Sequence, residues 1–373
     1  MIFWSNTITH SFFIMPHISE KNTKTFLIGG ILVLLQFSAI QIIKFYPHWI
    51  ESIYSRGIYP IIKYILDFIC SAIPFSIGDI LYIIIAVFFI YILNSVFKKK
   101  INLGTFLSKG LIYANIIYFL FHFNWGLNYY RIPLNENLQI DNAYTTDKLI
   151  EKTNFLLNKT NLIHQRLQEN DSLKIKIPYS QEVLQQHIDS AYTHLQQKIT
   201  LPLYPKNNNA KSSIISTGLN YMGFGGYLNP FTLEAQVNKH LPAYKMPVTF
   251  AHEKAHQSGF SKENEANFIG ALVCMESTDP YLQYAGYSFA LRYCLNDLYT
   301  QNEAKASWLH KQIRPGVLKN YKEVSDFWEN HETPLNYIME IIYDNFLKVN
   351  NQESGIETYN YVVALLVNYP QNS

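Results

Sequence analysis

Charged side chains are scarce in this sequence. Asp, Glu, Lys and Arg make up 16% of its 373 residues, against the roughly 25% that is typical of soluble domains. The formal net charge is only +2, so long-range electrostatics favours neither a nucleic-acid partner nor a strongly acidic one. We therefore expect no nucleic acid among the partners of this chain.

Cysteine is scarce as well. The three cysteines, Cys70, Cys274 and Cys294, are too few for a disulfide framework and form no CxxC pair. Their pattern argues against a thiolate zinc site and against a thioredoxin-like redox centre. A bond between Cys274 and Cys294 in an oxidising compartment is one alternative. Two buried thiols on apolar helix faces are the favoured interpretation.

Long apolar runs take the place of charge in the first third. Residues 25–43 read TFLIGGILVLLQFSAIQII, and residues 77–97 and 103–127 are similar apart from one acid and one lysine. At 1.5 Å per residue, each run is long enough to cross the hydrocarbon core of a bilayer as a helix. Three such runs are hard to reconcile with core helices of a soluble protein, and the first is too long for a cleaved signal peptide.

A fourth apolar stretch, residues 57–75, is interrupted by Lys63, Asp67 and two prolines. We expect it to form an interfacial or re-entrant helix instead of a full span. Residues 25–131 are then a membrane region of about three transmembrane helices plus this helix, in contact with lipid.

Basic residues beside the spans predict their orientation. Lys21 and Lys24 precede the first span, and the cluster 98–100 with Lys109 lies between the second and third. Both groups favour the cytoplasm, although three basic residues on the far side weaken the rule. We expect a cytoplasmic tail over 1–24 and an extracytoplasmic domain over 132–373.

Residues 132–373 have the texture of a mainly helical α+β domain. Polar and apolar residues alternate with helical spacing over most of this length. A short strand is expected at 212–217, and one or two edge strands within 227–238, where Pro230 excludes a sheet interior. The helices are expected at 145–170, 180–199, 263–276, 279–300, 316–330, 334–350 and 356–368.

The stretch PVTFAHEKAHQSG (247–259) carries the most specific chemical signal. Pro247 suits the first turn of a helix and Gly259 suits the position just after its end. His252 and His256 are four residues apart, so both imidazoles share one helix face and can hold one Zn²⁺ ion. Glu253 lies beside that face, where it can accept a proton from an activated water. An amphipathic helix that carries two histidines by chance is the alternative.

A third ligand is expected soon after the glycine turn. Ser261 is the expected N-cap of the next helix, and Glu263 and Glu265 both lie in its first turns. The two acids are separated by about 200° around a helix, so they cannot both face one ion. Spacing alone leaves the choice between them open.

The residues ENEAN (263–267) resemble the E-x-x-A-[DN] signature of glutamate-type zincins, a group that includes membrane heat-shock and prenyl-protein proteases and the ImmA/IrrE-type proteases. This resemblance implies that Glu263 is the third zinc ligand. It also implies that Asn267 orients a zinc-bound histidine. Glu265 is then a flanking acid.

The whole chain also resembles an uncharacterised bacterial membrane-protein family that joins three N-terminal spans to a zincin-type domain. The segments FNWGLNYYR (123–131), GGYLNPFTLEAQVN (225–238) and HEKAHQSGFSKENEANF (252–268) carry this likeness. It implies a multi-pass protein of the bacterial inner membrane. One departure from the protease pattern is the gap of only six residues between His256 and Glu263, which leaves less room for loops that shape a substrate cleft.

The leading hypothesis is a membrane-anchored zinc metalloendopeptidase that acts on proteins or peptides. Its edge strand within 225–238 would pair with extended substrate, and Tyr287, Arg292 and His331 are candidates for stabilising the oxyanion. The alternative is a zinc-stabilised receptor or regulator without turnover. A channel or transporter is disfavoured, because the spans carry few internal charges.

Overall fold

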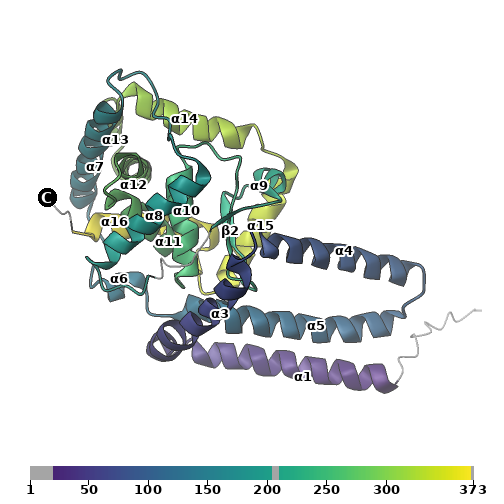
Figure 1. Cartoon of the computed structure of the whole chain (residues 1–373). Coiled ribbons are helices and arrows are strands. Elements are labelled where there is room, and N and C mark those ends of the chain that lie inside the picture. Colours follow the sequence, from purple (N-terminus) through teal and green to yellow (C-terminus); the bar gives the residue numbers. More distant parts are fainter. Residues whose placement is uncertain (1–19, 204–209, 371–373) are drawn as a thin grey trace, which may run out of the picture. The chain divides into compact units, whose positions relative to one another are not determined.

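The computed structural model describes residues 20–203 and 210–370. Most of these residues are helical, and one small mixed sheet completes the fold (Figure 1). The chain divides into two compact units, one formed by residues 1–41 and 84–119 and the other by residues 42–83 and 120–373. Most of the expected tail over 1–24 lies outside the described residues.

The first unit consists mainly of the larger parts of three long apolar helices: α1 (Glu20–Ile43), α4 (Ile77–Phe97) and α5 (Leu103–Asn124). The start of α4, up to residue 83, and the end of α5, from residue 120, belong to the second unit. All three are helices and are long and apolar enough to cross a membrane, which makes them candidate spans, as expected from the sequence. Asn115 on α5 donates a hydrogen bond to the carbonyl of Gly29 on α1 (3.1 Å) and accepts one from Gln36 (3.1 Å). Such interhelical hydrogen bonds matter in lipid, where burial of apolar surface does not drive helices together.

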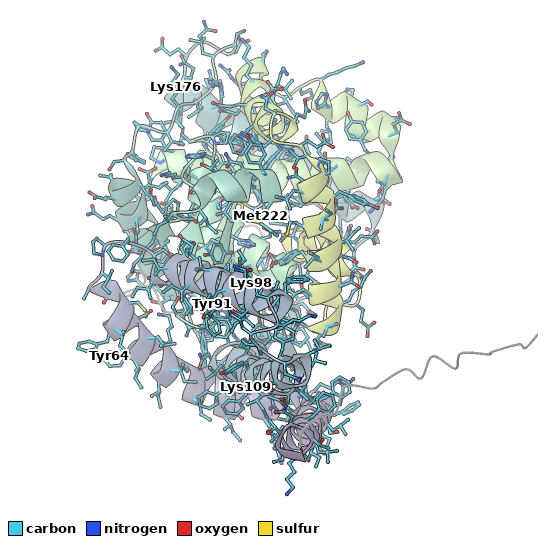
Figure 2. All side chains as sticks on the ribbon, turned by 90° about the vertical axis from the view of Figure 1, so that its right-hand side faces the viewer. Tyr64, Tyr91, Lys98, Lys109, Lys176 and Met222 are labelled. Carbon is cyan, nitrogen blue, oxygen red and sulfur yellow. The ribbon has the colours of Figure 1, made fainter. Side chains whose placement is uncertain are left out.

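The second unit opens with α2 (Pro47–Trp49), the π-helix η1 (Ile50–Ile58) and α3 (Tyr59–Ser71). One face of α3 is apolar and exposed, and Tyr64 on this face is labelled in Figure 2. The opposite face buries Lys63, which pairs with Asp67. This amphipathic pattern is typical of a helix that lies in a membrane interface. The exposed apolar residues are Ile61, Tyr64, Ile65, Phe68 and Ile69.

The rest of this unit is a helical body around the long helix α12 (Figure 1). Its apolar core joins α7, α11 and α12, and all three cysteines are buried and free, which confirms the favoured interpretation. The helices are η2 (Gly126–Tyr130), α6 (Leu134–Asn137), α7 (Thr146–Leu167), α8 (Gln181–Gln196), α9 (Ser216–Met222), α10 (Met246–Gln257), α11 (Glu263–Met275), α12 (Pro280–Gln301), α13 (Glu303–His310), α14 (Pro315–Glu329), α15 (Pro334–Val349), η3 (Gly355–Tyr361) and α16 (Val362–Asn368).

The sheet has the order β1-β3-β2. Its strands are β1 (Lys211–Ser212), β2 (Gly226–Leu228) and β3 (Ala235–Val237), with β1 parallel and β2 antiparallel to β3. Where one or two edge strands were expected within 227–238, two strands are present. β2 lies at an edge as expected, whereas β3 is the central strand, and Pro230 lies in the turn between them.

The prediction of a strand over 212–217 is wrong beyond Ser212, where β1 ends. The carboxylate of Asp79, in the first turn of α4, accepts hydrogen bonds from the backbone N–H of Ile214 (2.6 Å) and from the Ser213 hydroxyl (3.3 Å). These bonds take the backbone out of the ladder, and the chain enters α9 at Ser216.

Helix α10 lies against β2, β3, α11 and α12 and is buried on nearly every side. Pro247 stands in its first turn, and Gly259 follows its end with φ +82°. Both match the sequence prediction. A side chain at residue 259 would be strained by this backbone conformation and would crowd Tyr59 and Asn128.

Three side chains from the segments next to the spans satisfy carbonyls at the end of α10. Trp125 donates to the carbonyl of His256 (3.3 Å), Tyr59 to that of Gln257 (2.9 Å), and Arg131 to that of Gly259 (3.0 Å). The last carbonyls of a helix lack partners within it, so these bonds complete its C-terminus.

The guanidinium of Arg131 is itself buried and paired. It donates to both carboxylate oxygens of Glu51 (2.7 and 2.8 Å) and stacks over the ring of Phe260. Burial opposes ionisation of Glu51, but the charges of Arg131 and Arg56 outweigh it and lower the pKa of Glu51. The second unit therefore contains a bidentate ion pair shielded from water.

We expect Glu51→Gln to destabilise the protein by about 3–5 kcal/mol, because it leaves Arg131 as an uncompensated buried charge. Arg56, whose side chain is 42% exposed, provides the control. Arg56→Gln should cost no more than about 1 kcal/mol. The measurement is unfolding of the full-length protein in detergent micelles, and equal losses for the two variants would contradict the proposed role of the buried pair.

Candidate metal centre

Helices α10 and α11 bring His252, His256 and Glu263 together. One ligand atom from each lies within 4.8 Å of the other two. The Nε2 atom of His252 is 3.3 Å from one oxygen of Glu263, and the Nε2 atom of His256 is 3.6 Å from the other. Two imidazoles and a carboxylate on one small volume form a donor set that zinc accepts. It is the only such cluster in the described part of the chain.

A backbone carbonyl fixes the orientation of the His256 ring. Its Nδ1 atom lies 2.7 Å from the carbonyl oxygen of Phe260. A carbonyl can only accept, so Nδ1 carries the proton and Nε2 faces Glu263.

His252 has no equivalent support in the described residues, since its buried Nδ1 lacks a hydrogen-bond partner. Asn267 is buried in the second turn of α11, and its amide nitrogen also lacks a partner. The predicted role of Asn267 in orienting a histidine therefore stays a prediction.

Glu265 has a different environment from Glu263. One of its carboxylate oxygens accepts a hydrogen bond from the backbone N–H of Leu134 (2.9 Å), at the start of α6. Glu265 is thus held at the start of another helix, whereas Glu263 faces both histidines. This geometry favours Glu263 as the third ligand.

Ser261 was expected to cap α11, and this expectation is wrong. The N-cap residue is Lys262, and the buried hydroxyl of Ser261 has no partner in the described residues. The amide oxygen of Gln352 instead accepts a hydrogen bond from the backbone N–H of Glu263 (3.1 Å). Gln352, which is distant in the sequence, therefore accepts a hydrogen bond from the first turn of α11 in place of a local N-cap side chain.

Burial and the facing charges have opposing effects on the pKa values of this cluster. Burial opposes ionisation of Glu263, but the facing imidazoles of His256 and His252 outweigh it and hold its pKa well below the usual range. Burial lowers the pKa of His252, while the attraction of Glu263 overcomes burial at His256 and raises its pKa to about 9. A proton on His256 thus supplies positive charge in this volume, a role that a divalent cation can take over.

Glu253 lies between this cluster and the edge strand β2. Burial raises the pKa of its carboxyl to about 8, and one of its oxygens has no hydrogen-bond partner in the described residues. A Cβ atom added at Gly226 would lie 2.6 Å from the other oxygen. Glycine is therefore required at this point of β2 for the strand to approach the carboxylate.

Tyr343 on α15 is a site residue that the sequence analysis missed. Its hydroxyl donates a hydrogen bond of 2.5 Å to Glu263. The two residues are 80 positions apart, and Tyr343 is one of several aromatic residues in an apolar helix. No local pattern could have singled it out.

The three candidates for stabilising an oxyanion make their described contacts with other residues. Tyr287 packs against Phe155. Arg292 stacks over a tyrosine ring and donates to Ser325. The ring nitrogens of His331 lie near the carbonyl of Phe327 and the amide of Asn220. Their interactions, as far as the described residues show them, do not reach Glu253, Glu263 or the two metal-facing histidines.

Comparison with known proteins gives one match. The model of a family described as "Protein of unknown function (DUF3810)" matches residues 54–367. This range contains all the residues of the cluster, as well as Tyr59, Trp125 and Arg131. No curated protein and no solved structure matches the chain.

Metal content separates the two candidate third ligands. We expect the purified full-length protein to carry about one zinc per chain and Glu263→Gln to lose it, because a ligand is removed. Glu265→Gln is the matched control, two residues away in the same helix. It should keep the zinc, because the amide oxygen of glutamine can still accept the hydrogen bond from the Leu134 N–H. Elemental analysis checks this, and zinc loss only in the Glu265 variant would contradict the assignment.

Proposed function

We propose that this chain, which belongs to the DUF3810 family, is a membrane-anchored zinc metalloendopeptidase. One observation carries the proposal. His252, His256 and Glu263 converge on one small volume, and Glu253 lies beside that volume next to an edge strand. This arrangement suits metal-assisted hydrolysis of a peptide bond.

The residues present fit a zinc ion. The donor set is two imidazole nitrogens and one carboxylate, which leaves a fourth position of a tetrahedral ion for water or substrate. The cluster also contains a buried Glu263 oxygen that makes no hydrogen bond among the described residues and has Nε2 of His252 3.3 Å away. A buried lone pair of this kind is costly unless it is paired, and a cation would pair it.

When bound, zinc would lower the pKa of a water molecule and polarise the carbonyl under attack. Glu253 would accept the proton of the attacking water and then deliver it to the leaving amine. The raised pKa of Glu253 suits a group that must both take up and release a proton near neutral pH.

Strand β2 supports a peptide as the substrate. Among the described residues it pairs only with β3, and Gly226 brings it close to Glu253. An extended peptide added along the free edge would place its backbone beside the carboxylate. In this proposal the domain is extracytoplasmic, because Lys21, Lys24 and the lysines at 98–100 favour the cytoplasm.

A zinc-stabilised receptor without turnover is the second candidate. The side chains of His252, His256 and Glu263 are only 12%, 6% and 4% exposed. A closed site of this kind is also typical of structural zinc. The short gap between His256 and Glu263 favours the same candidate.

Replacement of Glu253 by Gln distinguishes the two candidates. In a peptidase, Glu253→Gln should lower cleavage of a quenched-fluorescent peptide library by about 10²–10⁴-fold, because the general base is lost, while bound zinc stays unchanged. Glu276→Gln, at the end of α11, is the control and should leave cleavage intact. If the wild type shows no zinc-dependent cleavage above the Glu253 variant, the receptor is favoured.

Tyr343 is the residue best placed to stabilise charge on the substrate. Its hydroxyl donates to Glu263 in this structure and would have to release that bond to donate to a developing oxyanion. We expect Tyr343→Phe to lower kcat by about 10²–10³-fold with little change in KM or zinc content. Tyr287→Phe is the matched control, and equal effects of the two substitutions would exclude this role.

A further inference from the structure

Helix α15 has three different faces. The inward face contains Tyr343, Phe346 and Leu347, of which only Leu347 is fully buried. A second face is polar, with Glu340, Asp344 and Lys348 spaced four residues apart and Asp344 paired with Lys348 (2.7 Å). The third face is apolar and exposed to between 43% and 74%. It consists of Leu335, Ile338, Ile341, Ile342 and Val349.

This concentration is unusual within residues 132–373. The other large exposed apolar side chains described there are mostly single residues on separate elements, such as Leu162, Val183 and Trp308. Scattered apolar residues are normal on a soluble surface, whereas a contiguous set on one helix indicates an interaction surface. The helix does not appear among the candidate spans, and at 16 residues it is too short to be one.

A contact between α15 and the end of the candidate span α5 indicates what covers the apolar face of α15. The ring of Phe346 packs edge-on against Phe121 (5.9 Å between centroids) and Tyr129 (6.2 Å). Phe121 lies in the last turn of the candidate span Leu103–Asn124. A helix in contact with this turn lies at the depth where the hydrocarbon core meets the headgroups, a level at which aromatic side chains are enriched.

We infer that α15 is a membrane-surface helix whose apolar face is buried in the bilayer crossed by the spans. The occupant of this face is the lipid acyl region. The row Glu340, Asp344 and Lys348 faces water, as expected for a helix that lies in the interface plane. Because Tyr343 on the inward face contacts Glu263, only the width of this helix separates the metal cluster from lipid.

The test uses full-length protein in phosphatidylcholine vesicles, with an environment-sensitive fluorophore on single introduced cysteines. Since all three native cysteines are buried, labelling is directed to the introduced ones, and unsubstituted protein measures the background. The variants are Ile338→Cys and Ile342→Cys on the apolar face, with Lys348→Cys on the polar face and Leu162→Cys on α7 as controls.

We expect nitroxide-labelled lipid to quench the fluorophore at 338 and 342 at least about threefold more than at 348 and 162. Aqueous iodide should show the reverse order. Iodide quenching at 338 and 342 as strong as at 348 would place the face in water and overturn the inference. Protection from both quenchers would show that protein covers the face, which also overturns it. The readout needs neither zinc nor cleavage, so it stands apart from the proposed peptidase activity.

Discussion

The end of helix α10 depends on side chains that the segments next to the membrane spans supply. This helix is buried and carries the two histidines of the candidate metal centre, so the carbonyls of its last turn cannot be left to water. Trp125 and Tyr59 donate to two of them, Arg131 donates to the carbonyl of Gly259 just beyond the helix, and Glu51 neutralises Arg131. The geometry of the candidate metal centre therefore rests on residues of the membrane region as much as on the motif itself.

The candidate site illustrates how environment assigns different roles to similar residues. Glu253, Glu263 and Glu265 are all buried glutamates within a short stretch. Glu263 faces two imidazoles, Glu265 accepts a backbone hydrogen bond from α6, and Glu253 lies next to a glycine strand without a cationic partner in direct contact among the described residues. The environment of Glu263 holds its pKa well below the usual range, so its carboxyl is ionised. The environment of Glu253 raises its pKa to about 8. The first suits a ligand and the second suits a proton carrier.

Features with a local cause could be predicted from the sequence. The spans follow from length and hydropathy, α10 from its proline and glycine, and the shared face of His252 and His256 from the helical repeat. Features with a distant cause could not. Asp79 diverts the backbone after Ser212, Gln352 replaces Ser261 at the start of α11, and Tyr343 reaches Glu263 from another helix. Each depends on tertiary contacts across many residues, for which a single sequence has no periodic signal. The roles of Glu253 and Asn267 stay predictions.

The bonds at the end of α10 also set an order of events during synthesis. Tyr59, Trp125 and Arg131 emerge from the ribosome 198, 131 and 128 residues before the carbonyls they bind. Their own segments flank helices that enter the bilayer early, whereas α10 is made much later. Closing contacts over such distances is slow, because the entropy of long loops must be lost first. Assembly of the His252, His256 and Glu263 cluster is therefore a late step of folding, which can finish only after these early segments are in position.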